Sequence, residues 1–266
     1  MSTNTDLILA EERLDGRILL LTINRPDAAN GIDDDLALAL EKQIERIKQS
    51  PVIEAVILTG TGRIFCSGGD VGAFKSALTT GEGAGELPAL LERLSTRIHA
   101  SLEALVNAGP LLIAAVNGPA TGAGLGLVCA TDIAYGRAGA VLRPGFSRLG
   151  LSPDTGTTHF LPRVVGYRKA LEILTRGDAI SAEQALSLGL FAELIDADGA
   201  DFVAQVIART TALIASGAAA LATRRLLRQS EAADLHAQLE REKASLIGLA
   251  ASPAVVSGLR KVLGIS

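Results

Sequence analysis

Residues 117–124 form a glycine-rich segment, Asn117-Gly118-Pro119-Ala120-Thr121-Gly122-Ala123-Gly124. It follows the apolar run Leu111–Val116, which is typical of a buried strand, and precedes the small and apolar run Leu125–Ala130, which we expect to be helical. Glycine lets the backbone turn sharply and lets a ligand approach the main-chain N–H groups. A strand, a glycine-rich turn and a helix in this order predict unpaired N–H groups that face a ligand at the helix N-terminus.

A similar turn, Phe65-Cys66-Ser67-Gly68-Gly69-Asp70, lies upstream between an apolar run and a possible helix. If the two turns converge, their N–H groups form an oxyanion hole that stabilises an enolate or a tetrahedral oxyanion. Without further evidence, the simpler interpretation of both is an ordinary tight turn. The spacing of Gly118, Gly122 and Gly124 also fits a dinucleotide-binding loop, but its mid-chain position and the lack of a Tyr-x-x-x-Lys sequence disfavour an oxidoreductase.

Strand and helix patterns alternate along the first part of the chain, and helical patterns dominate from Pro153 onward. This order predicts an α/β core with a helical C-terminal region. The composition of Thr79–Glu86 predicts a flexible loop. The predicted strands are Leu7–Leu14, Ile18–Ile23, Val52–Leu58 and Leu111–Val116, and the predicted helices are Asp33–Lys48, Val71–Leu78 and Leu87–Val106.

Composition excludes several classes of protein. Of the 266 residues 48% are hydrophobic, which is enough for a sizeable core. The formal net charge of −4 and the lack of a basic run argue against nucleic-acid and membrane-surface partners. The polar N-terminus is no signal peptide, and the apolar runs are too short to span a bilayer, so we expect a cytoplasmic protein. Cys66 and Cys129 are expected to be buried free thiols.

Six motifs follow one another along the chain: Leu21–Asn30 with its Asn-Arg-Pro turn, Phe65–Asp70, Ile113–Gly118, Phe146–Gly156, Leu161–Arg163 and Ile180–Ala185. In this order they resemble the crotonase (enoyl-CoA hydratase/isomerase) superfamily over nearly the whole chain. The resemblance implies a spiral of ββα units over residues 1–200 and a C-terminal helical trimerisation region over residues 201–266. It also implies an acyl-CoA substrate, a homotrimer or hexamer, and no cofactor beyond the coenzyme A carried by the substrate.

The same motifs imply roles for individual residues. The backbone N–H groups of Gly69 and Ala123 would be the oxyanion donors, and Asp154 falls at a catalytic position of the family. We expect no metal site, because His159 and His236 lack partners at ligand spacing. The residues implied to bind the substrate are Arg25, Ala28, Ser67, Gly69, Asp70, Val71, Gly72, Ala123 and Phe146.

The acidic residues at the motif positions indicate which chemistry to expect. Hydration in this family uses two glutamates, and those positions are Gly126 and Gly145 here. Asp154 remains, and a single carboxylate suits an isomerase that removes a proton at one carbon and returns it at another. The Phe146–Gly156 stretch resembles the 1,2-epoxyphenylacetyl-CoA and enoyl-CoA isomerases. Local sequence without the resemblance favours a different role for Asp154, as the cap of the following helix.

Other interpretations remain open. His99 lies on the flank of the helix Leu87–Val106, where it is either a partly exposed helix histidine or a second acid/base group facing the acyl pocket. The 4-chlorobenzoyl-CoA dehalogenases resemble the chain at Asp154 and His99, with a nucleophilic aspartate, but carry tryptophan at Phe146. A hydratase with a non-standard residue set and a non-catalytic CoA-binding scaffold are further alternatives. The acyl group is expected to contact the region Ala73–Ser95.

Overall fold

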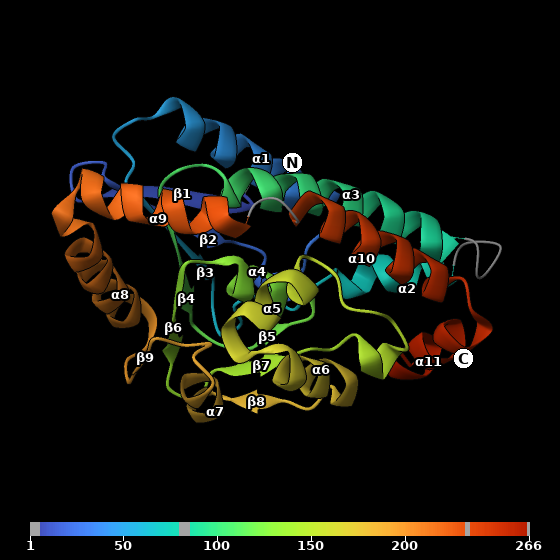
Figure 1. Cartoon of the computed structure of the whole chain (residues 1–266). Coiled ribbons are helices and arrows are strands. Elements are labelled where there is room, and N and C mark those ends of the chain that lie inside the picture. Colours follow the sequence, from blue (N-terminus) through green and yellow to red (C-terminus); the bar gives the residue numbers. More distant parts are fainter. Residues whose placement is uncertain (1–5, 80–85, 232–234, 265–266) are drawn as a thin grey trace.

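A six-stranded sheet forms the centre of the protein, as seen in a computed structural model that describes residues 6–79, 86–231 and 235–264 (Figure 1). Its strand order is β1-β2-β3-β4-β6-β9. The first pair, β1 and β2, is antiparallel, and every other neighbouring pair is parallel. The strands are β1 (Ile8–Arg13), β2 (Ile18–Ile23), β3 (Ala55–Gly60), β4 (Leu111–Val116), β6 (Ile133–Arg137) and β9 (Glu193–Ile195).

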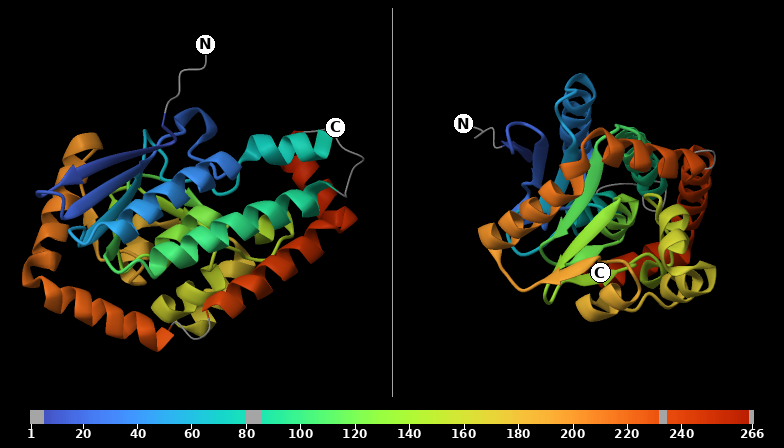
Figure 2. Two further views of the ribbon diagram at one scale, coloured as in Figure 1. Left: turned by 90° about the horizontal axis from the view of Figure 1, so that it is seen from above. Right: turned by 60° about the vertical axis from the view of Figure 1, so that its left-hand side comes forward.

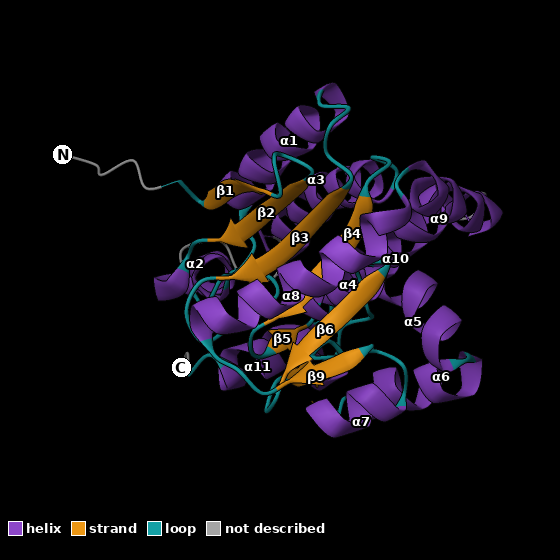
Figure 3. Ribbon diagram, turned by 90° about the vertical axis from the view of Figure 1, so that its left-hand side faces the viewer, coloured by secondary structure: helices purple, strands orange, loops and turns teal. Residues whose placement is uncertain are grey.

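The central strands are apolar on both faces because helices cover both faces of the sheet. Leu19 and Val56 point into one core with helices α1 (Asp34–Gln49), α3 (Glu86–Val106) and α4 (Ala123–Ala130). Ile18 and Ile57 point into a second core with α8 (Gly199–Leu213). Figure 3 shows α8 crossing in front of the sheet while α1 and α3 lie behind it.

The second half of the chain builds a smaller layer below the central sheet in Figure 1. It holds a three-stranded sheet of β5 (Ala120–Thr121), β7 (Val141–Arg143) and β8 (Ile180–Ser181). Its helices are α5 (Thr157–Val165), α6 (Tyr167–Arg176) and α7 (Ala182–Ser187), with single turns η1 (Pro26–Ala28), η2 (Ser147–Leu149) and η3 (Ile214–Ser216) elsewhere in the chain.

The last helices return to the core. After α9 (Ala218–Glu231), helix α10 (Leu235–Ala250) runs alongside α3, and α11 (Pro253–Val262) packs near the end of α2 (Val71–Thr79) (Figures 1 and 2). Leu246, Val255 and Leu259 from these helices share a small apolar cluster with Leu87 and Leu91 of α3. The C-terminal helices therefore cover the same chain's α2 and α3. The division of the chain at residue 200 stays a prediction.

Most predicted elements are confirmed, with three corrections. The hairpin forms at Asp15-Gly16, and Leu111–Val116 is a strand with the predicted bounds. The predicted strand Val52–Leu58 was placed too early, because the chain still turns before Ala55 and β3 continues to Gly60. The region after Pro153 is not purely helical, since β8 and β9 are strands too short for an alternating pattern to reveal. Strands β6 and β7 were not predicted.

The remaining expectations concern single features. Cys66 and Cys129 are free and buried, and burial raises the pKa of their thiols to about 11 and about 12. The predicted loop Thr79–Glu86 falls mostly on residues 80–85, outside the described residues. No single helix in the described ranges is both long and apolar enough to cross a membrane. One pair bent by 92°, Gly199–Ser216 with Ala218–Gln229, meets that test by length and composition alone.

Candidate active site

The Asn-Arg-Pro segment braces the first glycine-rich turn. The buried Asn30 accepts the Arg25 N–H at 2.9 Å and donates its amide to the Ile64 carbonyl at 2.7 Å. The Arg25 guanidinium forms ion pairs with Asp33 at 2.6 Å and Asp70 at 2.9 Å. These bonds connect the Asn-Arg-Pro segment to Ile64 and Asp70, which lie at the two ends of the glycine-rich turn. They therefore fix the position of that turn.

The two glycine-rich turns converge. Cys66 pairs with Ala120 in a parallel bridge, and the Thr121 N–H donates to the Cys66 carbonyl at 2.9 Å. Gly68 has a φ of +91°, and a Cβ there would lie 2.8 Å from the Thr121 carbonyl oxygen and 3.3 Å from the Ala123 nitrogen. Only glycine permits both that conformation and that approach.

Two backbone N–H groups are left unpaired where the turns meet. In the described part of the chain, neither the Gly69 nor the Ala123 N–H donates to a protein acceptor. Ala123 is the first residue of α4, and Gly69 lies just before α2, whose first turn is capped by the Asp70 carboxylate through the Ala73 N–H at 3.0 Å. Both donors therefore lie at the positive ends of helices, which favours a negative charge between them.

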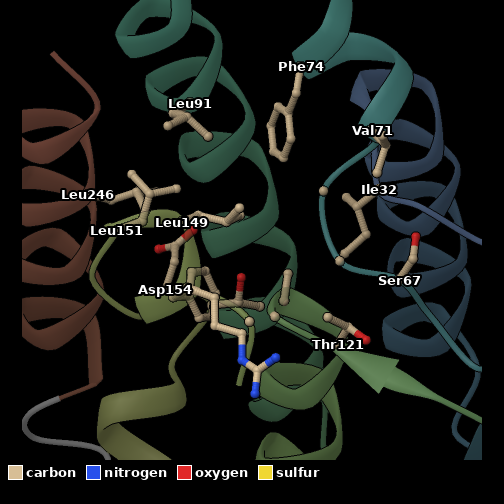
Figure 4. Close-up of a pocket in the computed structure, with 18 of the residues that line it drawn as sticks. Ile32, Ser67, Val71, Phe74, Leu91, Thr121, Leu149, Leu151, Asp154 and Leu246 are labelled. Atoms are coloured by element: carbon tan, nitrogen blue, oxygen red, sulfur yellow. The ribbon is translucent and has the colours of Figure 1, made fainter. Parts of the chain in front are cut away.

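A largely apolar cavity of about 490 Å³ opens beside these donors. Figure 4 shows Leu149, Leu151 and Leu246 gathered around Asp154, with Ile32, Ser67 and Val71 across the cavity from them. Phe74, Leu91, Leu94 and Ile98 add further apolar walls from α2 and α3. Among the described residues that line the cavity, Asp154 carries the one carboxylate.

Asp154 is held by two side chains of α3. Its Oδ2 accepts the Ser95 hydroxyl at 2.9 Å, and its Oδ1 lies 2.6 Å from His99 Nε2. All three side chains are buried, with Asp154 at 6% exposure. His99 Nδ1 has no partner among the described residues, so His99 contacts Asp154 through Nε2 alone. Asp154 is thus held as a paired acceptor at the edge of an apolar cavity.

The interpretation of Asp154 as a helix cap is wrong. The N-cap of α5 is Gly156, which has no side chain to cap the helix. Glu242 of α10 instead accepts the Gly156 N–H at 2.7 Å and the Thr158 N–H at 2.9 Å. A carboxylate from 86 residues away therefore replaces the local cap, and the Asp154 side chain turns toward the cavity.

Comparison with known proteins bears on what this arrangement does. The family model described as enoyl-CoA hydratase/isomerase matches residues 13–260. The chain belongs to the enoyl-CoA hydratase/isomerase family. Its structure resembles those of an enoyl-CoA hydratase from Bacillus halodurans (TM-score 0.84, 25% identity, 96% of this chain and 99% of that chain) and of an enoyl-CoA hydratase/isomerase from Mycobacterium paratuberculosis (TM-score 0.82, 28% identity, 98% and 100%).

Curated relatives within the enoyl-CoA hydratase/isomerase family carry different names. A probable enoyl-CoA hydratase of Mycobacterium tuberculosis is 37% identical over 66% of this chain and 66% of its own length, so the chain spans just under two thirds of that relative. The 1,2-epoxyphenylacetyl-CoA isomerase of Escherichia coli is 34% identical over 72% of this chain and 71% of its own length. A 4-chlorobenzoyl coenzyme A dehalogenase of Arthrobacter is 30% identical over 71% and 67%.

Only some of the residues that the family resemblance predicts to bind the substrate lie at the cavity. Ser67, Gly69, Val71, Ala123 and Phe146 line the cavity. The remaining ones predicted to bind the substrate do not line it, and their roles stay predictions: Arg25, Ala28, Asp70 and Gly72. Arg25 is occupied by its ion pairs with Asp33 and Asp70, so its side chain braces the turn.

His99 differs from both of its predicted interpretations. It is 4% exposed rather than partly exposed, because the Asp154 turn and α10 cover that flank of α3. It also does not line the cavity, so it contacts Asp154 from behind rather than facing the acyl pocket.

Sequence reasoning missed two members of this network. Ser95 was expected only as part of a pocket-lining region, and Glu242 stands in a charged run, Glu240–Lys243, that is typical of a solvated helix face. The spacing of Glu242 from Leu239 and Leu246 puts it on the apolar face of the helix, and this signal distinguishes it from the exposed Glu240. His99, Asp154 and Glu242 offer potential metal-ligand atoms within 4.8 Å of one another, but each side chain already has a hydrogen-bond partner in the protein.

Proposed function

We propose that the protein is an acyl-CoA enzyme that isomerises an enoyl-CoA or a ring-epoxide acyl-CoA with Asp154 as its single acid/base group. The observation that carries this is a lone buried carboxylate beside an apolar cavity and two unpaired N–H groups. In this mechanism the thioester oxygen accepts the Gly69 and Ala123 N–H groups. Asp154 takes a proton from one carbon and returns it to another, while those N–H groups stabilise the enolate.

The two glycines at the hydratase positions support isomerisation over hydration. Gly145 lines the cavity without a carboxylate, and Gly126 does not line it. No second acid/base side chain among the described lining residues is available to activate water. The Escherichia coli relative named as 1,2-epoxyphenylacetyl-CoA isomerase adds support. The exposed Arg143 and Arg148 at the cavity supply positive charge suited to an anionic CoA substrate.

A second candidate is hydrolytic dehalogenation of an aryl-CoA, with Asp154 as the nucleophile. The contact between Asp154 and His99 and the Arthrobacter relative favour it. Against it, His99 lies behind Asp154, where it does not reach a water molecule on the cavity side. We therefore rank isomerisation first.

Incubation with 2-enoyl, 3-enoyl, ring-epoxide and 4-chlorobenzoyl thioesters tests the proposal. An isomer of unchanged mass and altered retention supports it, a product that gains water indicates a hydratase, and loss of chloride indicates a dehalogenase. Binding of thioesters without turnover indicates a scaffold.

The role of Asp154 is tested in the same assay. Asp154→Asn keeps the shape of the side chain and should lower kcat by about 10²–10⁴-fold, because the proton acceptor is lost. Circular dichroism checks that the variant is folded. A variant that turns over like the wild type contradicts the assigned role.

We also propose a homotrimer or hexamer without a bound cofactor. Exposed apolar side chains on α5, α6 and α9, such as Val164, Leu171 and Leu226, support self-association. Sedimentation velocity at several concentrations measures the state, and a monomer throughout would contradict it.

A further inference from the structure

The backbone around Asp154 adopts a conformation that needs support. Thr155 has a φ of +57°, and Gly156 follows with a φ of +70°. A left-handed β-branched residue is a true outlier, which persists only when the surrounding structure holds it. The Asp154 side chain leaves the chain directly before this turn, so whatever holds the turn also sets the direction of the carboxylate.

Glu242 supplies the side-chain cap that reaches this turn. Its Oε2 accepts the Gly156 N–H at 2.7 Å, and its Oε1 accepts the Thr158 N–H at 2.9 Å together with the Thr158 hydroxyl. It is 3% exposed and stands on α10, which is packed along α3. Gln238, one turn earlier on α10, donates to the Thr158 hydroxyl at 2.6 Å and steadies the same contact.

Without Glu242, the orphaned N–H groups of α5 would compete for Asp154. Aspartate readily accepts from the N–H two residues onward, and that donor here is Gly156. An Asp154 drawn into this bond would leave Ser95 and His99 and turn away from the cavity. Occupation of these donors by Glu242 removes that alternative.

We propose that Glu242 is a positioning residue, whose carboxylate binds the N-terminal N–H groups of α5 and thereby keeps Asp154 turned into the acyl cavity. The inference rests on the proposed role of Asp154 as the acid/base group. It also gives the C-terminal helix α10 a part in the site beyond covering α3.

The charge of Glu242 makes this role depend on pH. The titratable groups that face it are Asp154 and, from α3, His99. Burial, and to a lesser extent the nearby Asp154 carboxylate, raise the pKa of Glu242 to about 7. The ionised form accepts N–H groups through both oxygens in charge-assisted bonds, whereas the protonated form resembles glutamine. Positioning should therefore strengthen as pH rises through about 7.

Glu242→Gln tests this, with Glu240→Gln as the matched control. Glu240 is exposed on the same helix, and its side chain is paired to Lys243. At about pH 8 we expect Glu242→Gln to lower kcat by about 10- to 100-fold with KM little changed, because the acyl pocket remains while the reacting carboxylate is misplaced. The ratio of wild-type to Glu242→Gln kcat should fall toward one near pH 6. Glu240→Gln should match the wild type.

Equal kcat for Glu242→Gln and the wild type at pH 8, or an equal loss in the Glu240→Gln control, would overturn the inference. If Glu242→Gln does not fold, Glu242→Asp, which keeps the charge but retracts it by one methylene, should show the same fall in kcat at pH 8. Asp154→Asn is run in parallel. Normal turnover by Asp154→Asn refutes the proposed function, whereas an inactive Asp154→Asn beside a fully active Glu242→Gln refutes only the positioning role.

Discussion

Gly126 leaves the space that the turn after Asp154 occupies. A Cβ at this position would lie 2.5 Å from the Thr155 carbonyl oxygen and 3.0 Å from the Thr157 hydroxyl. The Asp154 turn thus packs directly on α4, in the space that a side chain at residue 126 would need. A glutamate side chain at residue 126 and the observed turn after Asp154 would therefore occupy the same space.

Gly126→Ala should disturb the Asp154 turn. The added methyl group must displace Thr155, so we expect a fall in kcat of at least about tenfold and a loss of about 1–3 kcal/mol in the free energy of unfolding. Turnover assays and urea unfolding measure the two effects. Gly248→Ala on α10 is the control, since its Cβ meets nothing and should be neutral or stabilising by up to about 1 kcal/mol. Wild-type behaviour of Gly126→Ala would contradict this packing argument.

At the scale of elements, helices α3 and α10 lie side by side and run in opposite directions in Figure 1. Both contribute side chains that position the site. Ser95 and His99 are four residues apart on α3 and so project from one face toward Asp154. Glu242 and Leu246 have the same spacing on α10, where one caps α5 and the other lines the cavity. The position of α10 along α3 therefore determines both whether Glu242 reaches the α5 turn and where Leu246 lies in the cavity wall.

The buried Glu242 should make stability depend on pH. Its folded-state pKa of about 7 lies above the ordinary value of 4.5, so the folded state binds this proton more tightly than the unfolded state. The resulting stabilisation is full below about pH 4.5 and is lost as pH rises through about 7. It amounts to about 3 kcal/mol at most, since one pKa unit corresponds to about 1.4 kcal/mol.

Denaturant unfolding of the wild type and Glu242→Gln at pH 5 and pH 8 measures this effect. The stability of the wild type relative to the variant should be higher at pH 5 than at pH 8. The opposite order would mean that the pKa of Glu242 is lowered by folding. The ionised form of Glu242, which is expected to position Asp154, is thus the form that lowers the free energy of unfolding. Such a compromise between activity and stability is common at functional sites.

At the scale of the whole molecule, segments from both ends of the chain build one cavity. Ile32 and Ser67 come from the N-terminal part, while Leu259 and Val262 come from α11. Arg260 of α11 donates to the Leu78 carbonyl at 2.9 Å and so fastens this last helix to the end of α2. The acyl pocket is therefore complete only when the C-terminus has docked.

Truncation after Ser252 removes α11 and tests this closure. We expect KM to rise several-fold for long acyl chains and less for short ones, because only long chains reach the lost apolar wall. The thermal transition of the truncated chain checks folding, and Lys261→Ala, an exposed change on the same helix, serves as control. An unchanged KM for long chains would show that α11 does not bound the acyl site.

Sequence alone determined the fold and the order of the main elements. The hairpin at Asp15-Gly16, the strand Leu111–Val116 and the amphipathic helix ending at Val106 follow from turn chemistry and hydrophobic period, which are local properties. The two glycine-rich turns were predictable as turns, because a positive φ and a close approach, as at Gly68, admit only glycine, whereas their convergence followed only from the family resemblance. Short strands such as β8 and β9 escaped, because two or three residues carry no readable period.

The direction of the Asp154 side chain is visible only in the tertiary structure. Its local sequence favours a helix cap, but Glu242 of α10 accepts the N–H groups of Gly156 and Thr158 in its place. Likewise, His99 is buried because an element distant in sequence covers its flank of α3. The physical reason is the same in both cases. The hydrogen-bond partners and the covering surface belong to chain segments far away in sequence, and local sequence patterns do not identify them.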